Sequence, residues 1–294
     1  MRIALFAREV EYKWRERLCD VIKSFVERGA ELVYYKDFYY KMVEKYRLNI
    51  PEGELFSGSE DLGEKIDIFL CLGGDGTFLE SLTLIRDREI PVAGINFGRL
   101  GFLTSADSIP GTEWIDVLTS GNFYIEKRAV LEVSTANPIP GIYPFALNEV
   151  SIQRIDPSML SVDVSVDGLK LPTYWSDGIV LATPTGSTAY SLSIGGPIVM
   201  PSSKAVIIAP IAPHNLNVRP LVVPEEAVMK ITFNSRKGGA LLCVDNRSVQ
   251  IENNTEFVIK KANFDLNYIS LKPSGFFDAI KEKLLWGADK RNSF

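Results

Sequence analysis

The sequence predicts an α/β N-terminal domain with an open, mostly parallel sheet, joined to a β-rich, sandwich-like C-terminal domain. In the first third of the chain, short apolar runs alternate with segments whose apolar residues recur at helical spacing, which is typical of parallel strands connected by helices. Beyond that third, strand-like runs follow one another with few helices between them, until a helical pattern returns near the C-terminus. We therefore expect an α/β domain at residues 1–122 plus 272–294 and a β-rich domain at residues 123–271.

In the first domain the elements alternate along the chain. The run at 66–72 is apolar enough to be a strand buried on both faces, as strands of parallel sheets are. Residues 36–48 are expected to be partly helical, and residues 51–63 form a polar loop with three glycines. The expected strands are 2–7, 31–35, 66–72 and 90–96, and the expected helices are 14–28 and 78–86.

In the second domain the strands are short and separated by turn residues. Residues 161–166 alternate strictly between apolar and polar, and Asp167-Gly168 then supplies a hairpin turn. A final helix at 276–286 places Phe276, Ile280, Leu284 and Leu285 on one face. The expected strands are 130–134, 146–152, 160–166, 178–183, 205–210, 228–233, 240–244 and 257–261.

Composition and charge exclude several classes of function. The 294 residues suffice for two ordinary domains, and 46% hydrophobic with 23% charged residues is typical of a folded, soluble chain. A net charge of −5 argues against a nucleic-acid partner, which usually needs a basic domain. The three cysteines form neither a disulfide framework nor a zinc pattern. No apolar run is long enough for a signal peptide or a membrane span, so we expect a cytoplasmic protein without a membrane partner.

The sharpest local signal is the run Gly73-Gly74-Asp75-Gly76-Thr77 between a buried strand and a helix. Glycines let the backbone approach a ligand closely, and the following helix N-terminus offers free N–H groups to a phosphate. The run matches neither of the two common nucleotide motifs, GxGxxG and GxxxxGK[ST]. A plain alternative is a tight turn in which Asp75 caps the helix. A carboxylate in this position would repel phosphate unless it handles a metal or a hydroxyl proton, which favours a functional role.

Further signals lie in the second domain. A loop dense in hydroxyl groups runs from Thr183 to Ser191 and on to Gly195-Gly196-Pro197, and we interpret it as a binding loop rather than a capped short helix. Asn148-Glu149 is a polar pair in an otherwise apolar strand, which costs free energy unless it is satisfied or faces solvent. Asp177 and Asp245 are acids in ordinary turns, and neither indicates a site alone. The only histidine, His214, lies beside a proline and reads as structural.

Taken together and in this order, these motifs resemble the NAD kinases over almost the whole chain. The resemblance includes residues 73–77, the run Gly94 to Thr104 (GINFGRLGFLT) and Asn148-Glu149. It continues through Asp177-Gly178, residues 183–193 and Gly195-Gly196-Pro197, and ends with Pro213-His214-Asn215 and Arg219-Pro220-Leu221. Each motif alone is weak, but their combined order and spacing are very specific.

The resemblance implies an activity. NAD kinases transfer the γ-phosphoryl group of ATP to the 2′-hydroxyl of the adenosine ribose of NAD. The reaction uses a divalent metal, and the ion that we expect is Mg²⁺. Phosphoryl transfer needs positioning, neutralisation of charge and a group that takes the hydroxyl proton, which a carboxylate can do. Mg²⁺ prefers oxygen ligands, which suits a chain without clusters of histidine and cysteine, but we assign no protein ligand to it. The resemblance also implies self-association as a dimer or tetramer.

The resemblance further implies roles for individual residues. Asp75 resembles the proton acceptor, which would activate the ribose hydroxyl or position its metal. Asn148 and Glu149 resemble the pair that binds the ribose and base of NAD. Trp175 stands where some members of the family have arginine, and Arg247 stands where other members often carry glutamine, which puts those two contacts in doubt. The expected NAD-binding residues are Asp75, Gly76, Asn148, Glu149, Asp177, Thr188, Ala189, Tyr190, Ser191, Leu192, Ser193 and Asp245, and the expected nucleotide-phosphate residues are Gly73, Gly74, Gly76 and Thr77.

Three alternatives remain at this point. Diacylglycerol and sphingosine kinases share the Gly-Gly-Asp-Gly turn but usually follow it closely with Asn-Glu, whereas Asn148-Glu149 lies far along this chain. Phosphofructokinases also share the turn, but a β-rich second half does not suit them. A regulator that binds NAD(P) without turning over ATP would not need Asp75, so the presence of this acid counts against that interpretation.

Overall fold

The computed structural model describes residues 1–63, 65–97, 101–104, 112–236, 238–272 and 275–287. The chain divides into two compact units, each described here by itself. The first, which we call the α/β unit, comprises Met1–Glu126 with Leu266–Phe294. The second, the β unit, comprises Lys127–Asp265.

The α/β unit is built on a parallel sheet with the strand order β18-β5-β4-β1-β2-β3. Strand β4 is buried along its whole length, as expected for a strand at the centre of a parallel sheet. The sixth position is filled by the end of the long strand β18, where Tyr268 pairs with Val92. The strands are β1 Arg2–Phe6, β2 Glu31–Tyr35, β3 Glu54–Phe56, β4 Ile68–Leu72, β5 Val92–Ile95 and β18 Phe257–Ser270.

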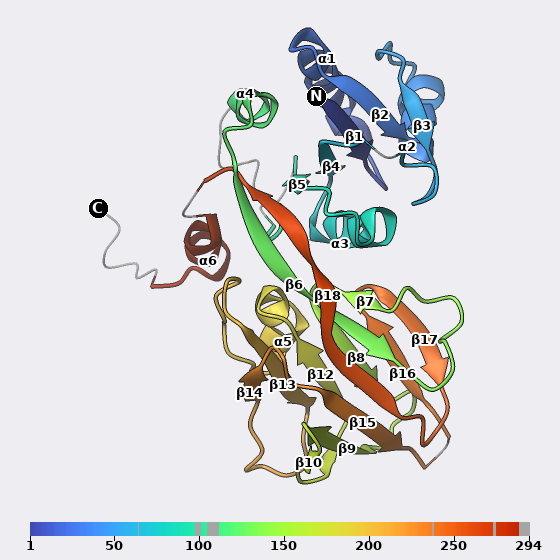
Figure 1. The fold of residues 1–294 in the computed structure, drawn as a ribbon, viewed down its shortest axis with the longest axis vertical. Helices are drawn as coiled ribbons and strands as arrows, with labels where there is room; N and C mark the ends of the chain where they lie inside the picture. The colour runs from blue at the N-terminus through green and yellow to red at the C-terminus, as the bar shows by residue number, and fades with distance from the viewer. Residues whose placement is uncertain (64, 98–100, 105–111, 237, 273–274, 288–294) are drawn as a thin grey trace. The chain divides into compact units, whose positions relative to one another are not determined.

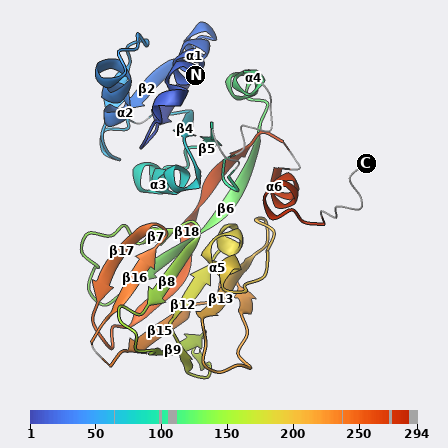
Figure 2. The same ribbon diagram turned by 180° about the vertical axis from the view of Figure 1, so that it is seen from behind.

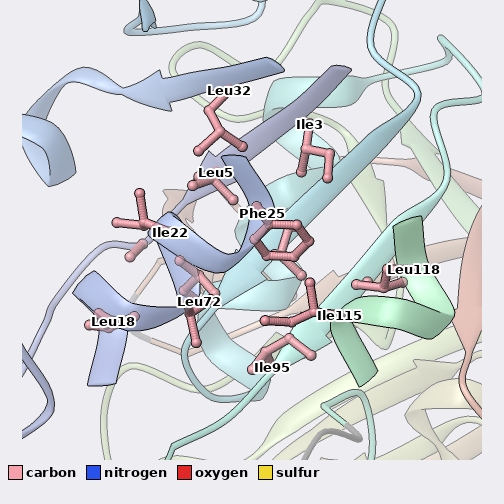
Figure 3. Close-up of a cluster of buried hydrophobic side chains, with 14 of the residues drawn as sticks. Ile3, Leu5, Leu18, Ile22, Phe25, Leu32, Leu72, Ile95, Ile115 and Leu118 are labelled. Carbon is pink, nitrogen blue, oxygen red and sulfur yellow. The ribbon is translucent and has the colours of Figure 1, made fainter. Parts of the chain in front are cut away.

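Helices cover both faces of this sheet, because side chains along each strand alternate between the faces. Helices α1 and α4 cover one face, where Phe25 and Ile115 pack in a single core with Ile3 and Leu5 of β1 (Figures 1 and 3). Helix α3 covers the other face, where the Phe78 ring lies 5.7 Å from that of Tyr268. The helices of this unit are α1 Arg15–Glu27, α2 Lys36–Tyr40, α3 Asp75–Ile85, α4 Glu113–Ser120 and α6 Gly275–Leu284, with a 3-10 helix at Tyr12–Trp14 and a π-helical turn at Lys41–Lys45.

The β unit consists of two sheets. The six-stranded sheet is antiparallel throughout, in the order β14-β13-β12-β8-β16-β17 (Figure 2). In the other sheet β9 pairs with β10, β11 and β15, β15 pairs with β18, and β6 pairs with β18 and β7. The elements are β6 Tyr124–Ser134, β7 Phe145–Ala146, β8 Glu149–Gln153, β9 Leu160–Val166, β10 Leu169–Lys170, β11 Tyr174–Ser176, β12 Gly178–Ala182, β13 Ala205–Ile211, β14 Leu221–Pro224, β15 Met229–Asn234, β16 Ala240–Val244 and β17 Arg247–Ile251, with a 3-10 helix at Thr185–Thr188 and α5 at Tyr190–Ser193.

Apolar side chains from the two sheets of the β unit share one core. Ile152 of β8 and Leu242 of β16, in the six-stranded sheet, belong to the same buried cluster as Val162 of β9 and Phe257 of β18. This packing of two largely antiparallel sheets confirms the predicted β-rich second half, and the parallel sheet confirms the α/β first half. Among the described residues, no helix is both long and apolar enough to cross a membrane.

Several elements differ from those expected. Helix α3 begins at Asp75, three residues before the predicted start, because Gly74 serves as its N-cap residue in extended conformation. The predicted polar loop at 51–63 contains the strand β3, whose three residues pair only with β2. Helix α4 was not predicted, although Gly121 ends it in the left-handed conformation typical of a helix C-terminus.

Candidate functional site

The turn at residues 73–77 joins the carboxyl end of β4 to helix α3. The N–H of Gly73 donates to the carbonyl of Ile95 at 2.8 Å, which ties the turn to the neighbouring strand β5. A Cβ at position 73 would lie 2.6 Å from Oγ1 of Thr77, so a larger residue here would displace the Thr77 side chain. The turn therefore brings the backbone to the carboxyl edge of a parallel sheet, which is where open α/β sheets bind ligands.

The carboxylate of Asp75 does not cap helix α3, so the plain alternative for this residue is not what its side chain does. Instead Oδ2 accepts the N–H of Phe102 at 2.9 Å, and Oδ1 accepts the N–H of Leu103 and the hydroxyl of Thr104, each at 3.2 Å. We call residues 73–77 with 101–104 the turn cluster. The side chain of Asp75 is 33% exposed, so a ligand can reach it. The motif residues Gly98, Arg99 and Leu100 lie outside the described residues.

A lysine that the sequence did not single out, Lys283, lies beside the turn cluster. Lys283, in the last turn of α6, places Nζ 3.8 Å from Oδ2 of Asp75 and 4.5 Å from the centre of the Phe102 ring. The helical spacing of the sequence places Lys283 on the same face as Phe276 and Ile280, which indicates that this lysine is not fully exposed. Burial lowers the pKa of Lys283, and the nearby charge of Asp75 partly offsets that effect.

The second group of predicted residues gathers at one end of the six-stranded sheet, around Glu149. Strand β8 begins at Glu149, which pairs with Ala182 at the end of β12. The hydroxyl-rich loop follows β12 directly and lies against the residues before β8. The hydroxyl of Thr183 donates to the carbonyl of Leu147 at 2.6 Å, and the N–H of Thr183 donates to that of Asn148 at 2.9 Å. We call Asn148, Glu149, Asp245 and the loop 183–193 the Glu149 cluster.

Asp245 is a fully buried member of this cluster whose carboxylate faces the backbone of the neighbouring strand. Its oxygens accept the N–H groups of Leu147 at 2.9 Å, Asn148 at 2.8 Å and Glu149 at 3.2 Å. The guanidinium of Arg247 lies 3.5 Å from Oδ2 of Asp245 and donates to the carbonyl of Phe145. Asp245 and Arg247 therefore fix the chain immediately before β8.

The carboxyl group of Glu149 is buried in an environment that favours its neutral form. Burial raises the pKa of Glu149 to about 8, the negative charge of Asp245 adds to the increase, and the backbone N–H of Tyr190 opposes it. One Glu149 oxygen, Oε2, has no hydrogen-bond partner among the described residues, and the same holds for the hydroxyls of Thr185 and Ser191. Buried polar atoms are generally paired, so these three atoms, in one loop and the adjoining strand, are available to a polar ligand.

Asp177 lies at the opposite end of β12 from the loop that follows this strand. The next residue, Gly178, pairs with Gln153, whereas Glu149 pairs with Ala182 at the other end of β12. The five residues of β12 therefore separate Asp177 from the end of the strand that pairs with Glu149. The carboxylate of Asp177 pairs with Arg154 at 2.8 Å. Tyr190 is influenced by both ends, because burial raises its pKa and the charges of Cys243, Asp177 and Glu149 raise it further.

The structure thus brings Asn148, Glu149, Asp245 and residues 183–193 together, and it leaves Asp177 at the far end of one strand. The side chain of Trp175 is 46% exposed and offers no charge. No group of three or more histidine, cysteine, aspartate or glutamate side chains that could hold a metal occurs within the part of the chain that the structure describes.

The neutral state of Glu149 predicts how stability varies with pH. Between the ordinary value of 4.5 and about 8, the folded protein holds a proton on Glu149 that the unfolded chain releases, so the free energy of unfolding falls as pH rises through this window. Glu149→Gln removes this contribution. In urea unfolding at pH 5 and pH 8, we expect the wild type to lose on the order of a few kcal/mol more between the two pH values than Glu149→Gln does.

The exposed Glu252 provides the matched control for this experiment. Glu252→Gln is expected to keep the pH dependence of the wild type. Equal losses of stability in the wild type and Glu149→Gln would show that Glu149 is ionised in the folded protein at neutral pH.

Two family models match the chain. The ATP-NAD kinase N-terminal domain matches residues 30–119, and the ATP-NAD kinase C-terminal domain matches residues 147–271. The first match contains the turn at 73–77, and the second contains every member of the Glu149 cluster together with Asp177.

Similar proteins are also found among curated sequences and solved structures. The NAD kinase of Christiangramia forsetii is 37% identical over 296 residues, which cover 99% of this chain and 100% of the relative. The solved structure of an NAD kinase from Archaeoglobus fulgidus in complex with ATP is 26% identical, covers 96% of this chain and 98% of its own, and has a TM-score of 0.72. The yeast NADH kinase in complex with NADH, 24% identical, shares the fold with a TM-score of 0.87 and covers 100% of this chain and 90% of its own.

Proposed function

The chain belongs to the ATP-NAD kinase family, and on that premise we propose that its two clusters divide the work of the reaction. The enzyme transfers the γ-phosphoryl group of ATP to the 2′-hydroxyl of the adenosine ribose of NAD, which yields NADP and ADP. The turn cluster serves the phosphoryl transfer, and the Glu149 cluster binds NAD. The observation that carries this division is the contrast between the two acids. Asp75 is a partly exposed carboxylate held by three donors, whereas Glu149 is buried with a raised pKa and an unpaired oxygen.

Asp75 takes the proton of the ribose hydroxyl. As the 2′-oxygen forms its bond to the γ-phosphorus, its O–H bond breaks and the proton passes to the carboxylate of Asp75. The bond from the γ-phosphorus to the bridging oxygen breaks, and its electron pair leaves with ADP. The three donors on the carboxylate hold it in one orientation, and this positioning contributes to the rate because the transfer requires little covalent chemistry from the protein.

The N-terminus of helix α3 binds a phosphate group of the nucleotide. Gly76 lies in the first turn of the helix, where backbone N–H groups lack a partner in a preceding turn and the helix dipole favours negative charge. The N–H of Thr77 already donates to the carbonyl of Gly74 at 3.0 Å, so Thr77 offers its hydroxyl. Gly73 and Gly74 keep this approach free of side chains. An added Cβ at Gly76 would meet nothing within 4 Å, so there is open space beside the turn.

Glu149 and Asn148 bind the adenosine part of NAD. A neutral carboxylic acid can donate as well as accept a hydrogen bond, so protonated Glu149 can bind both a ribose hydroxyl and a base nitrogen. The unpaired hydroxyls of Thr185 and Ser191 add polar groups in the same loop, and residues 188–193 line the site. Asp245 serves this site indirectly, because its carboxylate holds the backbone of Asn148 and Glu149 in place.

Asp177 contacts a more distant part of the same ligand. NAD is an elongated molecule, and a strand of five residues separates Asp177 from the end of β12 that pairs with Glu149. Tyr190 lies within electrostatic reach of both acids, which supports a binding surface that runs from one to the other.

Mg²⁺ fits the donor groups of the turn cluster. Carboxylate and hydroxyl oxygens surround the turn, in Asp75, Thr77 and Thr104, and these are the ligand types that Mg²⁺ prefers. The ion commonly keeps several waters and binds chiefly to substrate phosphates, so ATP would bring most of its ligands and we assign no protein residue to it. When bound, it neutralises charge on the phosphates.

The family resemblance supports self-association, and the cysteine usage of the chain supports the location. The enzyme acts as a dimer or tetramer in the cytoplasm. The three cysteines, Cys19, Cys71 and Cys243, are free thiols, as is usual in a reducing compartment.

A coupled assay tests the proposed function. Purified protein with ATP, Mg²⁺ and NAD, coupled to an NADP-specific dehydrogenase, is expected to produce NADPH absorbance that EDTA abolishes and excess Mg²⁺ restores. Diacylglycerol, sphingosine and fructose 6-phosphate, offered in parallel, are expected to yield no ADP. Binding of NAD without formation of NADP would instead support the interpretation as a regulator.

A further inference from the structure

We propose that Lys283, on the C-terminal helix α6, is a positioning residue for the phosphoryl transfer and acts through Asp75. The inference rests on the proposed role of Asp75 as proton acceptor. It gives helix α6 a part in the reaction, although the residues of the turn cluster lie some 180 to 210 positions earlier in the sequence.

The first observation is the place of the Lys283 ammonium group. Its Nζ lies 3.8 Å from Oδ2 of Asp75, and the two side chains are 21% and 33% exposed. The same nitrogen lies 4.5 Å from the centre of the Phe102 ring, and the N–H of Phe102 donates to Oδ2. The cation is therefore held between the carboxylate and the residue that fixes it, rather than extended into solvent as surface lysines usually are.

The second observation is the hydrogen-bonding capacity of the Asp75 carboxylate. Its two oxygens can accept about four hydrogen bonds. Oδ1 accepts two, from Leu103 and Thr104, and Oδ2 accepts one, from Phe102. Among the donors in the described part of the chain, Oδ2 therefore accepts fewer hydrogen bonds than Oδ1, and Oδ2 is the oxygen that faces Lys283. A hydroxyl group that gives its proton to Asp75 would therefore approach the oxygen beside this ammonium group.

The third observation is the sequence of helix α6. Phe276, Ala279, Ile280 and Lys283 follow the spacing of one helical face, and all four are at least partly buried. Lysine on such a face is costly unless its charge has a partner. Lys281, two residues earlier, points elsewhere and is exposed. The Asp75 carboxylate is the partner that accounts for a lysine at position 283.

These contacts define what Lys283 does. Its positive charge lies beside Oδ2 and orients this oxygen toward the incoming hydroxyl. Among the residues that the structure describes, the groups that face the carboxylate are the N–H groups of Phe102 and Leu103, the Thr104 hydroxyl and the Lys283 ammonium, and of these four Lys283 carries the full charge.

Kinetic measurements on three variants test this role. Lys283→Met is expected to lower kcat at least about tenfold, as removal of one charged group beside a reacting atom commonly does, while KM for NAD changes less than threefold. Lys283→Arg keeps the charge and is expected to recover much of the loss. Lys281→Met, the matched control on the same helix, is expected to match the wild type. Equal melting temperatures of Lys283→Met and Lys283→Arg would show that the lower kcat of Lys283→Met does not come from a loss of folding.

A double-mutant cycle shows whether Lys283 acts through Asp75. If it does, adding Lys283→Met to Asp75→Asn should change the residual kcat less than twofold. Multiplication of the two losses in the double variant, or a wild-type kcat in Lys283→Met, would overturn the inference. Wild-type activity in Asp75→Asn alone would instead overturn the proposed role of Asp75, so the two failures are distinguishable.

Discussion

Replacing Asp75 with asparagine is expected to lower kcat for NADP formation by about 10²- to 10⁴-fold, the range that a positioned proton acceptor commonly contributes. Asparagine has nearly the same shape but cannot take the hydroxyl proton. Its amide oxygen can still accept one of the N–H groups that Asp75 accepts from Phe102 and Leu103, so the turn should keep its conformation. The coupled NADPH assay measures this loss.

The control for this prediction is Asp87→Asn, which alters an exposed aspartate beyond the end of helix α3. It is expected to leave both kcat and the melting temperature unchanged. Turnover within threefold of the wild type in Asp75→Asn would contradict the assignment of Asp75 as the proton acceptor.

Replacing Gly186 with alanine is expected to raise KM for NAD at least about tenfold and to destabilise the β unit by about 1–3 kcal/mol, the usual cost of overpacking. A Cβ at this position would overlap the Asn148 carbonyl oxygen, and it would lie 2.6 Å from the carbonyl carbon and 2.8 Å from Cα of the same residue. These are backbone atoms, and the N–H groups of Asn148 and Glu149 are fixed by Asp245. Either the loop or Asn148 must therefore move.

Gly58→Ala is the matched control, because a Cβ there would meet nothing within 4 Å and the backbone is not in the left-handed region. Steady-state kinetics with varied NAD, together with urea unfolding, give both quantities. An unchanged KM for NAD in Gly186→Ala would show that the position of Asn148 does not matter for binding.

The sequence was sufficient for the fold class and for the outline of the turn, because both depend on local signals. The buried run at β4 and the glycines that follow it indicate a strand that ends in a tight turn, whatever the rest of the chain does. Where the helix begins was harder to predict. Glycine, aspartate and threonine are weak helix formers, and α3 starts at Asp75 only because Gly74 provides the N-cap.

The contacts made by the candidate residues depend on long-range packing and could not be predicted in the same way. Asp245 follows Asn148 by nearly a hundred residues, and nothing in its turn indicates that its carboxylate accepts three N–H groups at and just before the start of β8. The residues around an aspartate in a turn do not show whether its carboxylate will be exposed to solvent or buried. The raised pKa of Glu149 has the same origin, because it depends on burial and on Asp245.

Lys283 could be predicted from the sequence only in part. Its position on the same face as Phe276 and Ile280 is visible in the sequence, and it indicates a lysine that is not fully exposed. The partner of that lysine is not visible, because Asp75 and Lys283 are brought together only when α6 packs within the α/β unit.

The most direct test of the account is a single-turnover measurement of phosphoryl transfer in Asp75→Asn by rapid quench, with enzyme in excess over γ-labelled ATP and NAD saturating. Calorimetry on the same preparation gives the Kd for NAD. We predict that the rate of transfer to NAD falls at least about 100-fold while the Kd stays within threefold of the wild type. A wild-type transfer rate, or a loss of NAD binding large enough to explain the slower turnover, would contradict the account.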